Sequence, residues 1–385
     1  MKIKKTAVTR RDFLKTGGIG IVGLAGAGGV SSLAAPPQLR DQEPASQEPN
    51  DSHLESHNAF GTVGTVDHAA NGFDPMEVLY DFDYGEVKTE GGRTVREWQI
   101  FALDREFEIA PGIYFPGWVY GSPTSAASVR NGKVIGQCPG PTLRCVEGEL
   151  LRVHFVNASE HPHTIHFHSI HAASMDGVPG SGPGVIRSGG TFTYEFEAKP
   201  FGCHLYHCHA LPLKRHIHKG LYGGFIVDPD PNRFEGEQRE IAKTRNHQYP
   251  ENDGFNEMVM VMNAFDTNFD GNNEVYAANS IAFAYGMQSP IAIRRDQIQR
   301  IYLINLTEFD PINSMHIHAN FFDYYDHGTT LEPTSKTIDT VMQCQAQRGI
   351  MELSFAGFEP GMYMFHAHQS EFAELGWMGF FKVQE

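Results

Sequence analysis

Two stretches of this sequence decide its fold, because each repeats the pattern of the other. The first runs from Pro141 to Asn157 (PTLRCVEGELLRVHFVN) and leads into residues 163–168 (HTIHFH). The second runs from Pro290 to Leu306 (PIAIRRDQIQRIYLINL) and leads into residues 313–318 (NSMHIH). Each predicts a strand, an acidic turn, a second strand and then a loop that enters a His-x-His strand. An internal repeat of this size indicates two domains of one fold.

The composition supports an all-β architecture. The 385 residues include 40 Gly, 22 Pro, 27 Phe and 14 Tyr, which favours strands and tight turns over long helices. From about Thr94 onward, short alternating segments are separated by Gly, Pro and Asn. We therefore expect two β-sandwich or barrel domains, at residues 59–230 and 251–385. The boundary falls near residues 228–252, where Pro, Asn and charged residues replace the alternation.

The N-terminus is typical of an exported protein. Basic residues that include Arg10-Arg11 are followed by an apolar, Gly/Ala-rich run at 17–30 and by a small-x-small cleavage site at 32–34. We predict that residues 1–34 form a twin-arginine signal peptide, with an uncleaved membrane anchor as the alternative. Residues 35–58 are predicted to be a polar linker, and the mature chain to be periplasmic or secreted.

Charge and cysteine content narrow the class of function. The chain carries 46 acidic and 30 basic residues, a formal net charge of −16, which argues against a nucleic-acid partner. After the signal, no segment is long and apolar enough to cross a membrane. Five cysteines are too few for a disulfide scaffold, and Cys208 stands apart because it lies between two histidines. The other four either form disulfides or are buried thiols: Cys138, Cys145, Cys203 and Cys344.

The 20 histidines include four His-x-His pairs, two in each copy of the repeat. Residues i and i+2 of a strand share a face, so the two imidazoles of each pair point together. Eight imidazoles suit copper, zinc or nickel, and are enough for about three ions. The pairs are His166/His168, His207/His209, His316/His318 and His366/His368.

Cys208 belongs to a second group of ligands because of its parity. Since it lies between the two histidines of one pair, its sulfur faces away from the eight imidazoles. His163 has the opposite parity to the pair that follows it, and it can face the same way as Cys208. Further along the chain, either His216 or His218 could supply the next imidazole of this group. A His₂Cys set with a weak or absent axial ligand is the arrangement of blue-copper electron-transfer sites.

These motifs resemble those of the multicopper oxidases, specifically the two-domain, laccase-like kind, which shares its architecture with copper nitrite reductases. The matching motifs are His-x-x-His-x-His at 163–168, His-Cys-His at 207–209 and His-x-x-x-Gly-Leu at 216–221. The resemblance implies two cupredoxin-like Greek-key domains, of which only the first carries a type 1 copper. It also implies four coppers per chain: one type 1, one type 2 and two type 3.

By the same resemblance, type 1 copper takes His163, Cys208 and His216, with Leu221 at the axial position where relatives often have Met. The segment before His216 is three residues longer than usual, which leaves His218 as an alternative, while the following Gly-Leu favours His216. Type 2 copper would take His166 and His316. The type 3 pair would take the remaining paired histidines: His168, His207, His209, His318, His366 and His368.

Other residues have supporting roles in this interpretation. Asn313, Ala367 and Phe372 replace the type 1 ligands in the second domain, which explains why no type 1 copper is expected there. Asp176 matches an acidic residue that helps protons reach oxygen near type 2 copper, or else it forms an ordinary Asp-Gly turn. Further candidates for proton transfer are Glu371 and Glu374. Candidates for contacts to the ligands, or for ordinary surface positions, are His161, His171, His204 and His218.

The resemblance implies an oxidase that couples one-electron oxidation of a substrate at type 1 copper to four-electron reduction of dioxygen to water at a trinuclear centre. In two-domain relatives this centre forms between subunits of a homotrimer, which we expect here. A copper nitrite reductase is the first alternative, although that family has Asp where this chain has His166. A copper-binding electron carrier is the second, but it would need only the type 1 site. The reducing substrate stays open among phenols, aromatic amines and metal ions.

Overall fold

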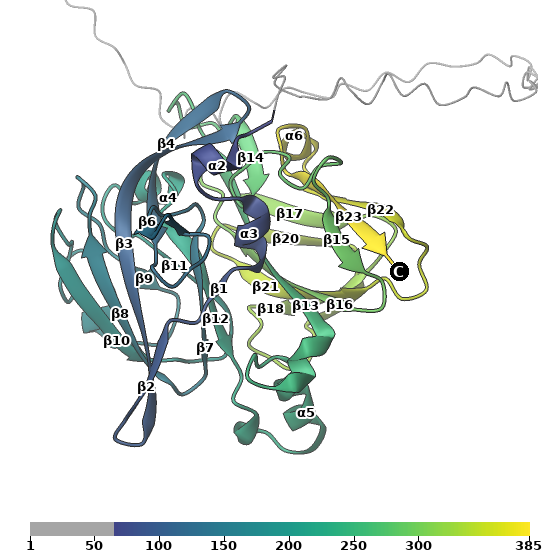
Figure 1. Ribbon diagram of the computed structural model, residues 1–385, viewed down its shortest axis with the longest axis horizontal. Helices are drawn as coiled ribbons and strands as arrows, with labels where there is room; N and C mark the ends of the chain where they lie inside the picture. Colours follow the sequence, from purple (N-terminus) through teal and green to yellow (C-terminus); the bar gives the residue numbers. More distant parts are fainter. Residues whose placement is uncertain (1–64) are drawn as a thin grey trace, which may run out of the picture. The chain divides into compact units, whose positions relative to one another are not determined.

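Strands dominate the computed structural model, which describes residues 65–385 (Figure 1). Four large sheets of five, five, six and five strands, together with one two-stranded sheet, contain them. The predicted all-β fold class is therefore confirmed. The predicted signal peptide and linker, residues 1–58, lie outside the described residues. Within the described part, the helices are all too short or too polar to span a membrane.

The first half of the chain folds into two facing sheets. One has the order β10-β8-β3-β2, with β4 paired to β3, and the other has the order β1-β7-β12-β11-β9. A separate ribbon consists of β5 and β6. The strands are β1 (Phe82–Asp83), β2 (Glu86–Glu90), β3 (Arg93–Ala110), β4 (Ile113–Gly121), β5 (Val129–Arg130), β6 (Lys133–Val134), β7 (Gly140–Val146), β8 (Leu150–Asn157), β9 (His166–Phe167), β10 (Thr191–Glu197), β11 (Gly202–His207) and β12 (Tyr222–Asp228).

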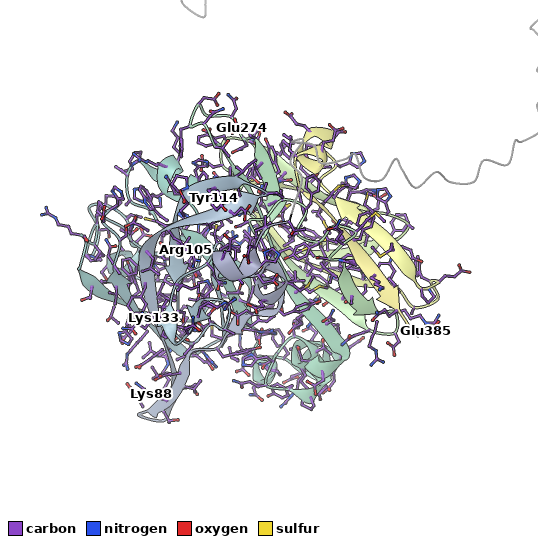
Figure 2. The ribbon with its side chains drawn as sticks, turned by 45° about the horizontal axis from the view of Figure 1, so that its top comes forward. Lys88, Arg105, Tyr114, Lys133, Glu274 and Glu385 are labelled. Carbon is purple, nitrogen blue, oxygen red and sulfur yellow. The ribbon has the colours of Figure 1, made fainter. Side chains whose placement is uncertain are left out.

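The second half forms another two sheets, with the orders β14-β13-β16-β21-β18-β19 and β15-β23-β22-β17-β20. The strands are β13 (Phe255–Phe265), β14 (Val275–Ala278), β15 (Ile291–Arg294), β16 (Ile298–Asn305), β17 (Ile312–Ile317), β18 (Phe322–Asp326), β19 (Ser335–Ile338), β20 (Thr340–Cys344), β21 (Arg348–Ser354), β22 (Gly361–His366) and β23 (Met378–Gln384). Figure 2 shows the side chains on this framework, with Lys88 on the β2–β3 hairpin and Glu385 after the last strand.

Short helices occupy the connections. The α-helices are α2 (His68–Asn71), α3 (Pro75–Tyr80), α4 (Leu213–His218), α5 (Gly236–Thr244) and α6 (Ser370–Glu374). The 3₁₀ helices are η2 (Ala173–Met175), η3 (Pro231–Arg233) and η4 (Pro250–Gly254). Helix α5 and its two flanking 3₁₀ helices join the two halves, and α4 follows the end of β11.

Three apolar cores separate the four sheets. One lies inside the first half, one inside the second, and the third between the two inner sheets. Strand β13 contributes to two of them: Met258 and Met260 pack into the second-half core, whereas Val259 and Val261 pack into the core between the halves. A strand that is buried on both faces has a continuous apolar run instead of an alternation.

The two halves share their central strand pairings. Strand β3 runs parallel to β8 with Ala102 opposite Asn157, and β13 runs parallel to β16 with Met262 opposite Asn305. Strands β9, β11 and β12 pair in sequence in the first half, just as β17, β22 and β23 do in the second. The repeated sequence stretches therefore occupy equivalent positions in two similar sandwiches.

Candidate metal centre

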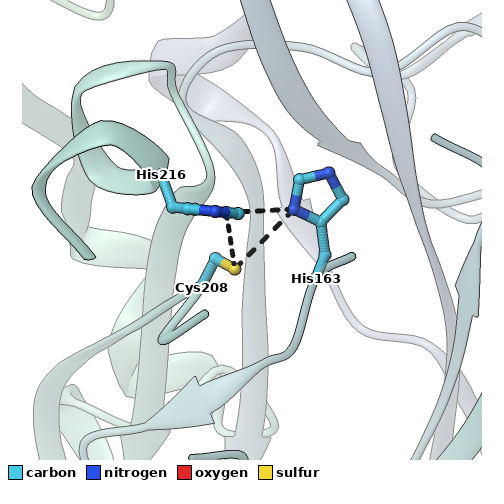
Figure 3. Close-up of side chains that lie close together, drawn as sticks. All are labelled: His163, Cys208 and His216. Atoms are coloured by element: carbon cyan, nitrogen blue, oxygen red, sulfur yellow. Dashed lines mark hydrogen bonds between the residues drawn. The ribbon is translucent and has the colours of Figure 1, made fainter. Parts of the chain in front are cut away.

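One thiol and two imidazoles meet in a buried group beyond the end of β11 (Figure 3). The Sγ atom of Cys208 lies 3.3 Å from Nδ1 of His216 and 3.8 Å from Nδ1 of His163. The two Nδ1 atoms lie 3.1 Å apart. A sulfur and two imidazole nitrogens that converge in this way are the donor set of a blue-copper site.

Three different local structures hold these donors. His163 exchanges two backbone hydrogen bonds with Ile186, of 3.0 and 2.9 Å. Cys208 directly follows β11, and its N–H donates to the carbonyl of Leu221 at 2.9 Å. His216 lies on the short helix α4. Leu221, at the predicted axial position, is fully buried and has no sulfur to offer a metal.

Burial determines the protonation of the three donors. Desolvation, reinforced by neighbouring imidazoles, lowers the pKa of His163 to about 3, and desolvation with the nearby Arg215 charge lowers the pKa of His216 to about 4. Both rings are therefore neutral at pH 7, which is the form that binds a metal. Burial raises the pKa of the Cys208 thiol, so its thiolate needs a cation such as copper beside it.

The structure brings His216, and not His218, to Cys208. Nε2 of His218 accepts a hydrogen bond of 2.9 Å from the backbone N–H of Asp266, and its ring packs among aromatic side chains. These contacts give His218 a packing role in the core between the two halves.

A separate cluster of four imidazoles comes from β9 and the end of β11. The ring centroid of His166 lies between 5.0 and 5.4 Å from those of the other three, which are His168, His207 and His209. Nε2 of His168 lies 3.1 Å from Nε2 of His207. Because Nδ1–H of His207 donates to the carbonyl of Cys208 at 2.9 Å, its Nε2 carries a lone pair that faces the cluster.

These imidazoles also fit metal binding by their charge. Burial, reinforced by neighbouring histidines, lowers the pKa of His168 to about 2, and burial lowers the pKa of His207 to about 4. Burial lowers the pKa of His166 as well. Nδ1 of His209 is buried and has no hydrogen-bond partner in the described structure. A bound metal ion would explain neutral imidazoles packed this closely with an unpaired nitrogen among them.

The second half carries an equivalent cluster on β17 and β22. The ring centroid of His316 lies between 5.1 and 5.4 Å from those of the other three, which are His318, His366 and His368. Nε2 of His318 lies 3.0 Å from Nε2 of His366, and Nδ1–H of His366 donates to the carbonyl of Ala367. His318 and His368 are exposed, so this cluster opens to solvent on the described chain.

The two clusters do not meet within one chain. Across residues 65–385, every ring contact among the eight imidazoles joins two members of the same cluster. Strands β9 and β17 belong to sheets that the six-stranded sheet separates (Figure 1). A cavity of about 640 Å³ beside the first cluster is lined by His166 and His168 but by no member of the second. Each cluster therefore contains four of the eight paired imidazoles.

Comparison with known proteins agrees with this geometry. Residues 121–232 and 256–385 each match a multicopper oxidase family. A solved multicopper oxidase structure is 50% identical in sequence with a TM-score of 0.71, and the alignment covers 83% of this chain and 100% of that one. The chain belongs to the multicopper oxidases, whose members are copper oxidoreductases.

Curated relatives match over shorter stretches. Laccase abr2 of Aspergillus fumigatus is 35% identical over 119 residues, which are 30% of this chain and 20% of that protein. A copper-containing nitrite reductase of Neisseria meningitidis is 36% identical over 96 residues, 24% of each chain. This multicopper oxidase thus spans about a fifth of the length of the curated relatives it matches.

Asp176 lies directly behind the first cluster of this multicopper oxidase. Its Oδ1 atom is 2.9 Å from Nδ1 of His166, and its backbone carbonyl is equally close to the same nitrogen. The next residue, Gly177, has φ +69°, and a Cβ atom there would lie 1.9 Å from the carbonyl oxygen of Ile165. Glycine therefore lets the Asp176 turn approach the ligand strand. Nδ1–H of His166 is held by these acceptors, so its Nε2 is left for a metal.

The second half contains matching contacts that no sequence pattern indicated. Nδ1 of His316 lies 2.9 Å from the carbonyl of Asp339 and 2.9 Å from Oγ1 of Thr340, whose hydroxyl donates to Oδ1 of Asp339 at 3.1 Å. The carbonyl of Asp339 thus matches that of Asp176, whereas the Asp339 carboxylate is connected to His316 only through the Thr340 hydroxyl. The spacing from histidine to aspartate differs between the two copies, which hid the equivalence in the sequence.

The type 1 position in the second half is filled without a metal ligand. Nδ2 of Asn313 donates to Oγ1 of Thr307 at 2.9 Å, and Phe372 stacks on Tyr276 with a centroid distance of 4.0 Å. Ala367 is fully buried in the apolar core. In the described second half, these three positions therefore offer no thiol or imidazole to a metal.

The remaining candidate residues either contact groups near the first cluster or lie on the surface. His171 lies 3.8 Å from Asp176, whereas Nε2–H of His204 donates to the carbonyl of Pro200. Glu371 and Glu374 on α6 and also His161 are exposed. No disulfide joins the cysteines, all of which lie in the described residues: Cys138, Cys145, Cys203 and Cys208 are buried, and Cys344 is exposed. Cys138, Cys145 and Cys203 therefore match the expectation of buried thiols, and no cysteine matches the alternative of a disulfide.

Proposed function

We propose that this multicopper oxidase carries four coppers per chain and couples one-electron oxidation of a substrate to reduction of dioxygen to water. The observation that carries the proposal is that consecutive side chains at the end of β11 belong to two different donor sets. Cys208 belongs to the His₂Cys group, whereas its sequence neighbours His207 and His209 belong to the imidazole cluster. Copper bound at these sites would supply one-electron transfer at the first and four-electron reduction of dioxygen at the second.

The residues of the chain have separate tasks in this proposal. His163, Cys208 and His216 hold type 1 copper, and Cys208 connects it by single backbone steps to His207 and His209. Asp176 holds the proton at Nδ1 of the type 2 ligand His166 and is the group closest to that ligand for relaying protons. Glu371 and Glu374, on the helix α6 that follows His368, stay proposed residues for proton transfer.

A homotrimer completes the trinuclear centre. Since the two imidazole clusters of one chain do not meet, the cluster on β9 and β11 would face the cluster on β17 and β22 of a neighbouring copy. Together they supply the eight ligands: His166 and His316 for type 2 copper, and His168, His207, His209, His318, His366 and His368 for type 3 copper. Twin-arginine export would place this assembly in the periplasm or outside the cell.

The reducing substrate is a phenol, an aromatic amine or a metal ion. A copper nitrite reductase is less well supported, because a single type 2 copper does not need eight imidazoles. An electron carrier would need only the His₂Cys group. Oxygen uptake by the copper-loaded protein with a panel of these reductants, and with nitrite as the competing acceptor, separates the substrate classes and the two enzyme types.

Two variants test the division of labour. Cys208→Ser removes the thiolate, so the blue absorption should vanish and substrate oxidation should fall to near background, while about three of four coppers and the trimer remain. His316→Ala should keep the blue band and accept one electron from substrate, but it should not turn over with oxygen. Copper analysis, optical and paramagnetic-resonance spectra and oxygen uptake provide the measurements. A blue Cys208→Ser variant, or normal turnover by His316→Ala, would contradict the proposal.

A further inference from the structure

A line of hydrogen bonds runs from the His₂Cys group to the surface. Nε2 of His163, the nitrogen that faces away from Cys208, lies 2.9 Å from Oγ of Ser159. The Ser159 hydroxyl donates to Oδ1 of Asp104 at 2.8 Å. Ser159 is 1% exposed, whereas Asp104 lies on the surface of β3. A buried hydroxyl therefore connects a type 1 ligand to a carboxylate on a neighbouring strand.

The chemistry of the three groups fixes the direction of these bonds. The Asp104 carboxylate can only accept, so the single hydroxyl proton of Ser159 goes to it. The lone pairs of Ser159 Oγ then accept from the backbone N–H of His161 at 3.1 Å and from Nε2–H of His163. With its proton held at Nε2, the neutral imidazole of His163 has a free lone pair at Nδ1, the atom that faces Cys208 and His216.

The second half of the chain contains an internal control for the hydroxyl. The N–H of Thr307 donates to Oδ1 of Asn305 at 3.0 Å, just as the N–H of Ser159 donates to Oδ1 of Asn157 at 3.1 Å. Thr307 is thus the equivalent of Ser159. It bonds to Asn313, which stands where the first half has its copper-binding histidine. The hydroxyl is present in both halves.

The carboxylate, in contrast, is present only where the histidine is. Ala102 pairs with Asn157 in the first half, and Met262 pairs with Asn305 in the second. Two residues further along these strands stand Asp104 and Ala264 respectively. The half with the His₂Cys group therefore has a carboxylate behind its hydroxyl, and the half without that group has a methyl.

We propose that Ser159 and Asp104 are positioning residues for the type 1 copper, acting through His163. The inference rests on the proposed function, since it assumes copper at the His₂Cys group. A hydrogen bond from the outer nitrogen to an acceptor backed by a carboxylate fixes the ring orientation and makes the inner nitrogen a stronger donor. A stronger donor favours Cu(II) over Cu(I). The hydrogen-bonded series His163–Ser159–Asp104, called the relay below, would therefore hold the copper more tightly and lower its reduction potential.

Four variants of the full-length, copper-loaded protein test the relay. Ser159→Ala removes the hydroxyl, and Asp104→Asn removes only the charge. Ser159→Thr keeps a hydroxyl, in the residue type that the second half has at Thr307. Thr307→Val removes the equivalent hydroxyl where no type 1 copper binds and serves as the matched control. The measurements are the reduction potential, from a redox titration followed at the blue band, and the retention of type 1 copper against a chelator.

The expected results differ between the halves. Ser159→Ala should raise the potential and weaken copper retention by about 10- to 100-fold, the range for lost contacts to a metal ligand. Asp104→Asn should raise the potential by less, Ser159→Thr should match wild type, and Thr307→Val should leave both quantities unchanged.

Unchanged values in Ser159→Ala, or an equal shift in Thr307→Val, would overturn the relay while leaving the oxidase proposal intact. Should Ser159→Ala fail to fold, Asp104→Asn decides, because its side chain is exposed: an unshifted potential there refutes the relay. A wild-type protein that develops no blue band with copper refutes the proposed function, and the relay with it.

Discussion

Glu257 bridges the two halves of the chain, and its removal should destabilise the whole fold. Its Oε2 accepts from Nη1 of Arg144 on β7 at 2.6 Å, and its Oε1 accepts from Nη1 of Arg300 on β16 at 3.1 Å. Tyr302 donates a further hydrogen bond of 2.8 Å. Both arginines are fully buried, so Glu257→Gln would leave two cations in the core without this carboxylate.

The pKa of Glu257 gives the magnitude. Burial alone would raise it, but Arg144 and Arg300 outweigh burial and lower the pKa from 4.5 to about 2. A difference of that size corresponds to about 3 kcal/mol of stability, the same order as the loss on breaking a buried ion pair. Because the folded pKa lies below the unfolded one, this contribution is complete above about pH 4.5 and disappears as the pH falls towards 2.

Urea unfolding of wild type and Glu257→Gln at pH 7 and pH 3 measures this contribution. We expect a loss of about 3 kcal/mol at pH 7, and about half of that difference or less at pH 3, where the unfolded carboxylate is protonated. Glu197→Gln is the matched control, since Glu197 pairs with Arg93 on the surface and should contribute less than about 1 kcal/mol. The same difference at both pH values, or one no larger than that of Glu197→Gln, would refute the assignment.

Two further predictions concern the copper sites. Gly177→Ala places a Cβ 1.9 Å from the carbonyl oxygen of Ile165, so the turn must move and carry Asp176 away from His166. Oxygen uptake should fall several-fold while the blue absorbance stays unchanged; unaltered uptake would contradict a role for this turn. His216→Gln should abolish the blue band and His218→Gln should keep it, because only the first side chain reaches the sulfur. The opposite pattern in absorption spectra would reverse the ligand assignment.

Strand parity explains why so much of the site could be predicted from the sequence. Alternation is a property of each strand by itself, so His207, Cys208 and His209 could be divided between two sites without knowledge of the fold. The internal repeat then located the second cluster around His316 and His366. For the same reason the all-β class was predictable, even though β13 has no alternation because it is buried on both faces.

Contacts between separate strands could not be predicted in this way. Asp104 reaches Ser159 only because β3 lies beside β8 in a particular register, which a single strand does not determine. The choice of His216 over His218 depends on the short helix α4, whose two histidines point to different partners. The separation of the two imidazole clusters depends on how the halves pack across their shared core.

The two halves of the chain have the same fold, but their histidine clusters differ in what lies beside them. In the first half, consecutive side chains at the end of β11 alternate between the thiol site and the imidazole cluster, so the two are connected by one residue. In the second half Ala367 stands at the thiol position, and only the imidazole face is kept. The second cluster thus has exposed imidazoles and no thiol beside it, so under the proposed function it would receive electrons only through the first cluster of another copy.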